Sequence, residues 1–250
     1  MTLGHFEAGW GWEAQIRQYV RKKYHRDLEG LTALEPQRLA RLLRGELLPE
    51  RPYATILWVM RLRPFRPLEL YWFLDHDPEY GVDCRVLYAR KSLAVPTEDA
   101  YVFAWDYLAL LARYGRGTFP LSDTSPGSEW LPFSDFAPSE ASPIKEVALG
   151  PREEPLRRLS LEVVEVAVAR MEVGTASQIS GGWQVTWPVL GDLALKLKVT
   201  PPAVELAFDS HGARKYPPEI LLSFTWLYLN ALLREARQVD PDLPRLSRYL

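Results

Sequence analysis

Two short runs of acidic residues and histidine are the side chains best suited to chemistry. Asp75, His76 and Asp77 form the first run, and Asp209 and His211 lie in the second. Imidazole and carboxylate groups bind divalent metals and transfer protons as general acids or bases. If the two runs met in the fold, they would form a metal site or an acid–base site. Because aspartate also favours turns, two solvated turns are the competing interpretation, and the sequence favours it.

Two basic pairs occur at equivalent places in the two halves of the chain. They are Arg90 with Lys91 and Arg214 with Lys215, each between an expected strand and an expected helix. Together they would suit an anion such as phosphate or carboxylate, since a helix N-terminus adds positive potential. The alternative is that all four are solubilising charges at strand ends.

Other signatures of chemistry are absent from the sequence. It has no P-loop, no dinucleotide-binding glycine pattern and no nucleophile elbow. The basic run 21–26 is better explained as a solvated helix end than as a nucleic-acid or lipid contact. Cys84 is the only cysteine, which excludes an internal disulfide or a cysteine-based metal centre. We expect no cofactor.

Composition indicates a globular protein of a reducing compartment. There are 30 Lys and Arg against 32 Asp and Glu, a net charge of −2, so a nucleic-acid partner is not expected. The longest apolar stretch, 220–233, is shorter than the roughly 20 residues of a membrane span. Without a signal peptide at the start, a cytoplasmic location and no membrane contact are predicted. Arginine outnumbers lysine and there are 21 prolines, a thermophile-like composition.

Hydrophobic periodicity places helices and strands along the chain. The N-terminal region reads as two helices, with Trp12, Ile16, Tyr19 and Val20 on one stripe of the first. The segment 161–173 fits a helix or a strand, and its length favours a helix. The expected helices are 11–25, 35–44 (ended by Gly45), 97–114 and 218–237; the expected strands are 53–62, 68–74, 83–89, 183–189, 193–199 and 203–208, with a turn at 75–78.

An internal repeat is the strongest signal. Aligned without a gap, 96–111 and 217–232 share seven of 16 residues, including Trp105 with Trp226 and Tyr107 with Tyr228. Strands precede both helices. This predicts an α+β fold of two duplicated β-β-β-α units, with both apolar helices buried in a pseudo-two-fold body. The expected divisions are 1–50 for the N-terminal helices, 51–115 for the first unit, 116–160 for a Pro/Ser-rich connection, and 161–250 for the second unit and tail, within one compact domain.

A family resemblance rests on an ordered set of short motifs in residues 97–233. They are Tyr107-Leu108, Trp130-Leu131-Pro132-Phe133-Ser134, Trp187-Pro188, Gly191-Asp192, Phe208-Asp209 and Tyr216-Pro217. In this order they resemble an uncharacterised prokaryotic family, domain of unknown function 3786. The resemblance implies no activity. Some relatives are joined to iron–sulfur modules, for which this chain lacks the cysteines.

The sequence favours a non-enzymatic protein-binding or accessory module. Catalytic signatures are lacking, while Trp, Tyr and Phe, which are enriched at interfaces, number 9, 12 and 9. Trp130, Phe133 and Phe136 in the connecting segment, and the tail 238–250, are the expected contacts with another protein. Two alternatives stay open: a metal-dependent enzyme using the Asp/His runs, and a protein that stacks single-stranded nucleic acid on its sheets. A homo-oligomer is also left open.

Overall fold

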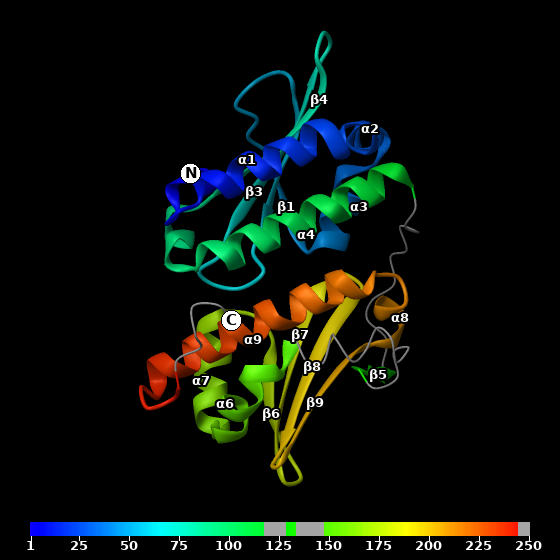
Figure 1. The fold of residues 1–250 in the computed structure, drawn as a ribbon. Coiled ribbons are helices and arrows are strands. Elements are labelled where there is room, and N and C mark those ends of the chain that lie inside the picture. Colours follow the sequence, from blue (N-terminus) through cyan, green and yellow to red (C-terminus); the bar gives the residue numbers. More distant parts are fainter. Residues whose placement is uncertain (118–128, 134–147, 245–250) are drawn as a thin grey trace. The chain divides into compact units, whose positions relative to one another are not determined.

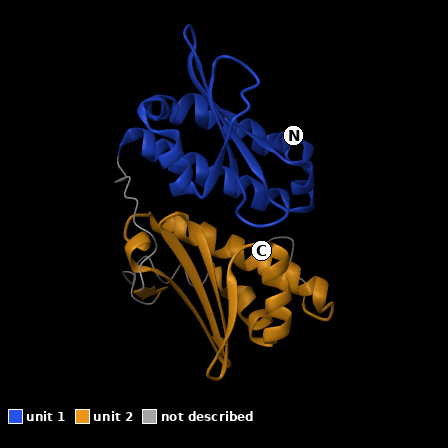
Figure 2. Cartoon of the chain, turned by 180° about the vertical axis from the view of Figure 1, so that it is seen from behind, with its two compact units in different colours: residues 1–123 blue, residues 124–250 orange. Residues whose placement is uncertain are grey.

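The chain divides into two compact units in a computed structural model that describes residues 1–117, 129–133 and 148–244. Unit 1 spans Met1–Asp123 and unit 2 spans Thr124–Leu250 (Figure 2). The division falls inside the expected Pro/Ser-rich connection. Each unit combines helices with one antiparallel sheet, so the α+β fold class is confirmed.

Unit 1 places helices before and after a four-stranded meander with the strand order β1-β2-β3-β4 (Figure 1). Its N-terminal region is α1 (Trp10–Gln18), the π-helical turn η2 (Tyr19–Lys23), α2 (His25–Glu29) and α3 (Pro36–Leu43), with short 3₁₀ turns η1 (Leu3–His5) and η3 (Gly30–Ala33). The rest is β1 (Gly45–Leu48), β2 (Ile56–Leu62), β3 (Leu70–Asp77), β4 (Gly81–Tyr88), the 3₁₀ turn η4 (Arg90–Ala94) and α4 (Thr97–Arg116).

Unit 2 has a similar order, with one added strand at the edge of the sheet. The strand order is β5-β9-β8-β7-β6. Its elements are β5 (Trp130–Pro132), η6 (Gly150–Arg152), α6 (Glu153–Arg158), α7 (Leu161–Met171), β6 (Thr175–Ile179), β7 (Gly182–Leu190), β8 (Leu193–Thr200), β9 (Ala203–Asp209), α8 (Ser210–Ala213) and α9 (Pro218–Val239). The segment 161–173, open between helix and strand, contains a helix.

Each meander has four strands where the sequence predicted three. The missed first strands are β1 and β6. β1 is only four residues long and follows α3 directly, while β6 has the polar sequence Thr-Ala-Ser-Gln-Ile. Neither shows a clear apolar alternation, because both are largely outside the core.

Both first strands begin just after a left-handed residue that ends the preceding helix. Arg44 after α3 and Glu172 after α7 each have a φ of 54°. The sequence predicted that Gly45 would end the first of these helices. Instead Gly45 opens β1, where an added Cβ would lie 2.7 Å from the side chain of Leu62. Glycine therefore fits the close packing against Leu62 and does not act as the helix cap.

The core of each unit forms where a long helix covers one face of the sheet. In unit 1 the Tyr88 hydroxyl on β4 donates a hydrogen bond to the Ala100 carbonyl of α4 at 3.1 Å. In unit 2 the ring of Trp187 on β7 lies 5.8 Å from that of Tyr228 on α9. Both tyrosines are at most 2% exposed. Burial of this apolar face is the main stabilising contribution.

The repeated helix residues have matching burial. Phe103 and Phe224 are fully buried, as are Leu108 and Leu229. Within the described ranges, no helix is both long and apolar enough to cross a membrane.

We predict that Leu229→Ala lowers the free energy of unfolding of unit 2 by about 2–5 kcal/mol, because it leaves a cavity in a packed core. The matched control is Val166→Ala on α7, whose side chain is 43% exposed and which should change stability by less than about 1 kcal/mol. Denaturant titration followed by circular dichroism measures both. Equal effects of the two substitutions would contradict the packing described for α9.

Candidate functional site

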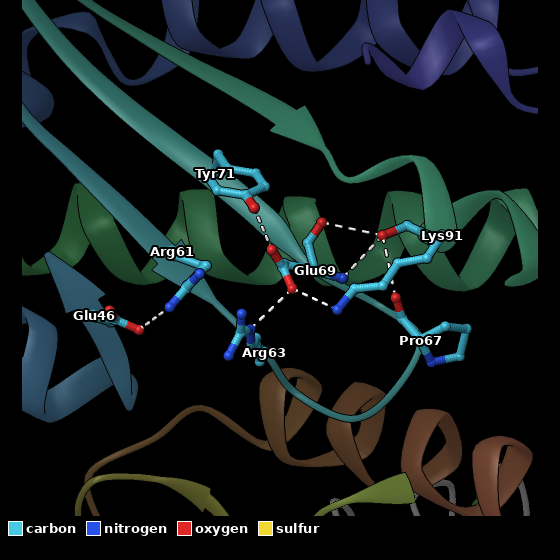
Figure 3. Close-up of polar contacts among 8 residues, drawn as sticks. Glu46, Arg61, Arg63, Pro67, Glu69, Tyr71 and Lys91 are labelled. Carbon is cyan, nitrogen blue, oxygen red and sulfur yellow. Dashed lines mark hydrogen bonds and ion pairs between the residues drawn. The ribbon is translucent and has the colours of Figure 1, made fainter. Parts of the chain in front are cut away.

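A buried carboxylate, Glu69, is the centre of the densest polar network in the described part of unit 1. Its side chain is 4% exposed and lies directly before β3. It accepts a hydrogen bond from Arg63 Nε at 2.9 Å, forms an ion pair with Lys91 Nζ at 2.7 Å and accepts the Tyr71 hydroxyl (Figure 3). Three donors from different segments therefore converge on one anion.

Hydrogen bonding outweighs desolvation at this carboxylate. Burial by itself would raise the pKa of Glu69, but hydrogen bonds from Lys91, Tyr71 and Arg63 hold that pKa at about 2. Burial, together with the bond to Glu69, raises the pKa of the Tyr71 hydroxyl. The backbone N–H of Glu69 also donates to Ser92 Oγ at 2.9 Å. The network stays ionised at neutral pH and ties β3 to η4.

Unit 2 contains a related network of a carboxylate, a lysine and a tyrosine. Asp192, 2% exposed and directly before β8, pairs with Lys215 Nζ at 2.9 Å. It also accepts the Tyr216 hydroxyl at 2.6 Å. In both units, therefore, a lysine that follows the fourth strand of the meander meets a carboxylate that precedes the third.

Within each of the two predicted basic pairs, the lysine and the arginine have different surroundings. Lys91 and Lys215 form ion pairs with carboxylates of their own units. Arg90 and Arg214 are exposed. The partners of the lysines could not be read from sequence, since Glu69 and Asp192 are distant along the chain. That the four residues bind an anion stays a prediction.

Asp75, His76 and Asp77 belong to β3, not to a turn as the sequence predicted. The reason is cross-strand pairing: Asp75 lies opposite Asp83 of β4, and the ladder continues to Asp77. Asp75 Oδ2 accepts a hydrogen bond from Arg85 at 3.2 Å. Asp77 Oδ1 accepts the backbone N–H of Glu79 at 2.8 Å and so shapes the β3–β4 turn.

The second acidic run has a local structural role. Asp209 ends β9 and its Oδ1 accepts the Gly212 backbone N–H at 2.8 Å, which caps the short helix α8. His211 is exposed on that helix. Among the described residues, no group of three or more His, Cys, Asp or Glu side chains is placed to hold a metal ion. Neither acidic run therefore supports the metal-site hypothesis.

The expected partner-binding aromatics of the connecting segment pack within unit 2. Trp130 pairs with Asp209 in the β5–β9 ladder, and Lys196 Nζ lies 3.6 Å from the centre of its ring. Burial lowers the pKa of this lysine. Phe133 is 3% exposed and stacks on Phe208 with ring centres 5.1 Å apart. Phe136 lies outside the described residues, as does the end of the tail.

A cluster of aromatic rings, which we call the aromatic surface, lies between α1 with η2 and α4. Its members are Trp12, Tyr19, Tyr24, Tyr101 and Trp105. Trp12 lies 4.3 Å from Tyr101, and Tyr19 lies 4.1 Å from Trp105, measured between ring centres. Trp12 is 37% exposed.

Lys23 extends the aromatic surface, and Trp10 is exposed at the start of the same helical segment. Lys23 Nζ lies 5.1 Å from the ring centre of Tyr19 and 5.8 Å from that of Trp105, a cation–π arrangement. Trp10, at the start of α1, is 77% exposed. Sequence reasoning placed Trp12 and Tyr19 on one stripe with Ile16 and Val20. Only the two aliphatic residues are buried, whereas the aromatic rings pack along α4 and stay partly open.

The cysteine of the chain is not suited to act as a nucleophile. Burial raises the pKa of the Cys84 thiol far above its ordinary value, which keeps the thiol protonated and unreactive. The most buried carboxylates already accept hydrogen bonds. Comparisons with protein-family models, with curated proteins and with solved structures gave no match.

We predict that Glu69 stabilises unit 1 at neutral pH and that this contribution disappears in acid. Its folded pKa of about 2 lies below its unfolded value. The stabilisation is therefore complete above about pH 4.5 and is lost as the pH falls toward 2, with a magnitude of about 1–3 kcal/mol. Urea titrations of the wild type and Glu69→Gln between pH 2 and pH 7 measure it.

The control for this experiment is Glu46→Gln, which removes an ion pair with Arg61 at a carboxylate that is 59% exposed. An exposed pair contributes at most about 1 kcal/mol. If Glu69→Gln kept the acid dependence of the wild type, Glu69 would not be the ionised centre of the network.

Proposed function

We propose that the chain is a non-enzymatic protein-binding module that contacts its partner through the aromatic surface and Trp10. Two observations carry this proposal: the five rings of the aromatic surface include Trp12, which is 37% exposed, and Trp10 at the start of the same helix is 77% exposed. Tryptophan and tyrosine dominate the binding energy of protein interfaces, because a rigid ring buries a large area at a small entropic cost.

The charges around these rings indicate what the partner presents. Lys22, Lys23 and Arg26 lie on η2 and α2, at the end of the aromatic surface formed by Tyr19. A partner segment with apolar side chains for the rings and carboxylates for these cations is the best complement. We therefore propose an acidic, aromatic-binding segment of another protein as the occupant.

The enzymatic alternative has weaker support, since Glu69, Asp192 and Asp209 all have structural partners. For single-stranded nucleic acid, base stacking requires accessible ring faces along a basic groove. Here Tyr19 meets Trp105 edge to face at 83°, so each ring covers part of the other. Nucleic acid is accordingly an outcome of the test below, not the proposal.

We further infer that the two units arose by duplication. The shared order of strands, the Lys–carboxylate–Tyr network of each unit and the matching burial of repeated helix residues support this inference. Trp105 and Trp226 also agree: each is partly buried with a cation over its ring, Lys23 at 5.8 Å and Arg152 at 5.7 Å. The resemblance to domain of unknown function 3786, which rests on the ordered motifs of residues 97–233, is also a proposal. So is a reducing, cytoplasmic location, which the single cysteine supports.

We predict that a photo-crosslinking benzoylphenylalanine in place of Trp10 captures a discrete second protein in cells that naturally contain this chain. The same group in place of Tyr80, which is 78% exposed on the β3–β4 turn, is the matched control and should not capture it. With the captured protein purified, Trp12→Ala should weaken binding tenfold or more.

Crosslinking to nucleic acid at position 10, or identical products from positions 10 and 80, would contradict a protein-binding role for this surface. Circular dichroism of Trp12→Ala should match the wild type, because the side chain is 37% exposed and its loss opens no closed cavity.

A further inference from the structure

A cavity of about 320 Å³ lies beside β9, near the edge of the unit 2 sheet to which β5 adds (Figure 1). β5 pairs with β9 only between Ala207 and Asp209, and the cavity follows β9 from Val204 to Ala207. Its volume falls in the range of roughly 300–1,000 Å³ that is usual for small-ligand sites. All the residues that line it belong to unit 2, so the cavity is separate from the aromatic surface of unit 1.

Most of the residues that line the cavity are apolar. They are Pro132, Phe133, Leu149, Val204, Leu206 and Ala207. Four of these side chains are at most 5% exposed, and Phe133 is held in place by its stacking on Phe208. An apolar wall of this kind favours a ligand with a hydrocarbon or aromatic body, because binding removes the apolar surface of that body from water.

Three charged side chains also line the cavity, and two of them neutralise each other. Lys198 Nζ lies 3.0 Å from Glu205 Oε2, and the two residues are paired across the β8–β9 ladder. The third is Lys196, two residues before Lys198 on β8, so both lysines project from the same face of the strand. Two lysines and one glutamate give the lining a net charge of +1, and the charge without a counter-charge is that of Lys196.

Lys196 has no anionic partner in the part of the chain that the structure describes. Its Nζ forms no hydrogen bond or ion pair there and lies 3.6 Å from the centre of the Trp130 ring, which is not part of the cavity lining. An ammonium group has three N–H donors, and one ring face occupies only one side of it. Burial lowers the pKa of Lys196 because it desolvates the charged form, and a bound anion would stabilise that form.

We propose that this cavity binds a small monocarboxylate with an apolar body. The carboxylate accepts hydrogen bonds from the Lys196 ammonium group, and the apolar body lies against Phe133 and Leu149. The net charge of the lining repels a cation, and a neutral ligand leaves the ammonium group without an anion. A zwitterion gains nothing from its second charge, because the carboxylate of Glu205 is already paired with Lys198. The requirement that the site leaves unmet is one negative charge beside an apolar wall.

Isothermal titration of the full chain with four matched probes tests this proposal. 4-Methylpentanoate has both required features, and 4-methylpentanamide is its neutral analogue of the same shape. Isopentylamine carries the opposite charge, and acetate has the negative charge without the apolar body. We expect saturable binding of 4-methylpentanoate, at least tenfold tighter than that of any other probe, because each of the others lacks the charge-assisted hydrogen bond or the apolar contact.

Two variants locate the site. Lys196→Gln should weaken the binding of 4-methylpentanoate tenfold or more, since it removes the one cation of the lining that has no counter-charge. The matched control is the double variant Lys198→Gln with Glu205→Gln, which removes the ion pair from the same cavity but keeps the net charge of its lining. This control should leave the binding of 4-methylpentanoate unchanged. Circular dichroism of both variants should match the wild type.

Absence of saturable binding of 4-methylpentanoate at millimolar concentrations, equal binding of the amide, or unchanged binding by Lys196→Gln would each overturn the proposal. The comparison of the four probes uses the wild-type chain, so it remains decisive even if a variant fails to fold. Since none of these measurements involves Trp10 or Trp12, their failure would leave the protein-binding proposal standing.

Discussion

Burial of one long apolar helix against one face of an antiparallel sheet, four-stranded in unit 1 and five-stranded in unit 2, is the constraint on which each unit depends. α4 in unit 1 and α9 in unit 2 bury nearly every large apolar side chain on their inner faces. A helix with so much apolar surface is unstable in water and needs the sheet as its partner. The positions of the turns, the networks and the exposed rings all follow from where this helix lies.

The buried carboxylate networks hold the chain in place just before each long helix begins. Lys91 lies on η4 just before α4, and Lys215 lies just before α9. Each pairs with a carboxylate at the start of the third strand, Glu69 or Asp192. A buried ion pair seldom adds much stability relative to apolar packing, because desolvation offsets its Coulombic attraction. We consider its main effect to be specificity: a mispaired register would leave a buried charge without a partner.

In unit 1, the helical segment formed by α1 and η2 has a buried face and a partly open face. On α1 and η2, Ile16 and Val20 are buried, while Trp12 and Tyr19 pack along α4 and stay partly open. A short amphipathic helix of this kind presents different chemistry on different faces because its side chains repeat every 3.6 residues. One helical segment can therefore contribute both to the core of unit 1 and to the aromatic surface.

The sequence predicted the elements whose signals are local. The apolar periodicity of 97–114 and 218–237 located α4 and α9 to within two residues, and the strands 183–189, 193–199 and 203–208 agree with β7, β8 and β9. The pattern of aspartates at 75–77 predicted a turn and was wrong, because pairing with β4 overrides turn preference.

The features that sequence could not supply depend on residues distant along the chain. Glu69 and Lys91 show no shared local pattern, and neither do Tyr19 and Trp105. The sequence predicted that Trp130 and Phe133 contact another protein, and it does not reveal that β5 adds to the edge of β9. Non-local pairing of this kind is set by the tertiary fold.

Hydrogen exchange of the full chain followed by mass spectrometry tests the central structural claim most directly. Backbone amides that open only with the core exchange slowest. If α4 and α9 are the cores of their units, their central amides exchange more slowly than those of α1, whose face with Trp10 is open to solvent. Exchange in α4 or α9 as fast as in α1 would contradict the account.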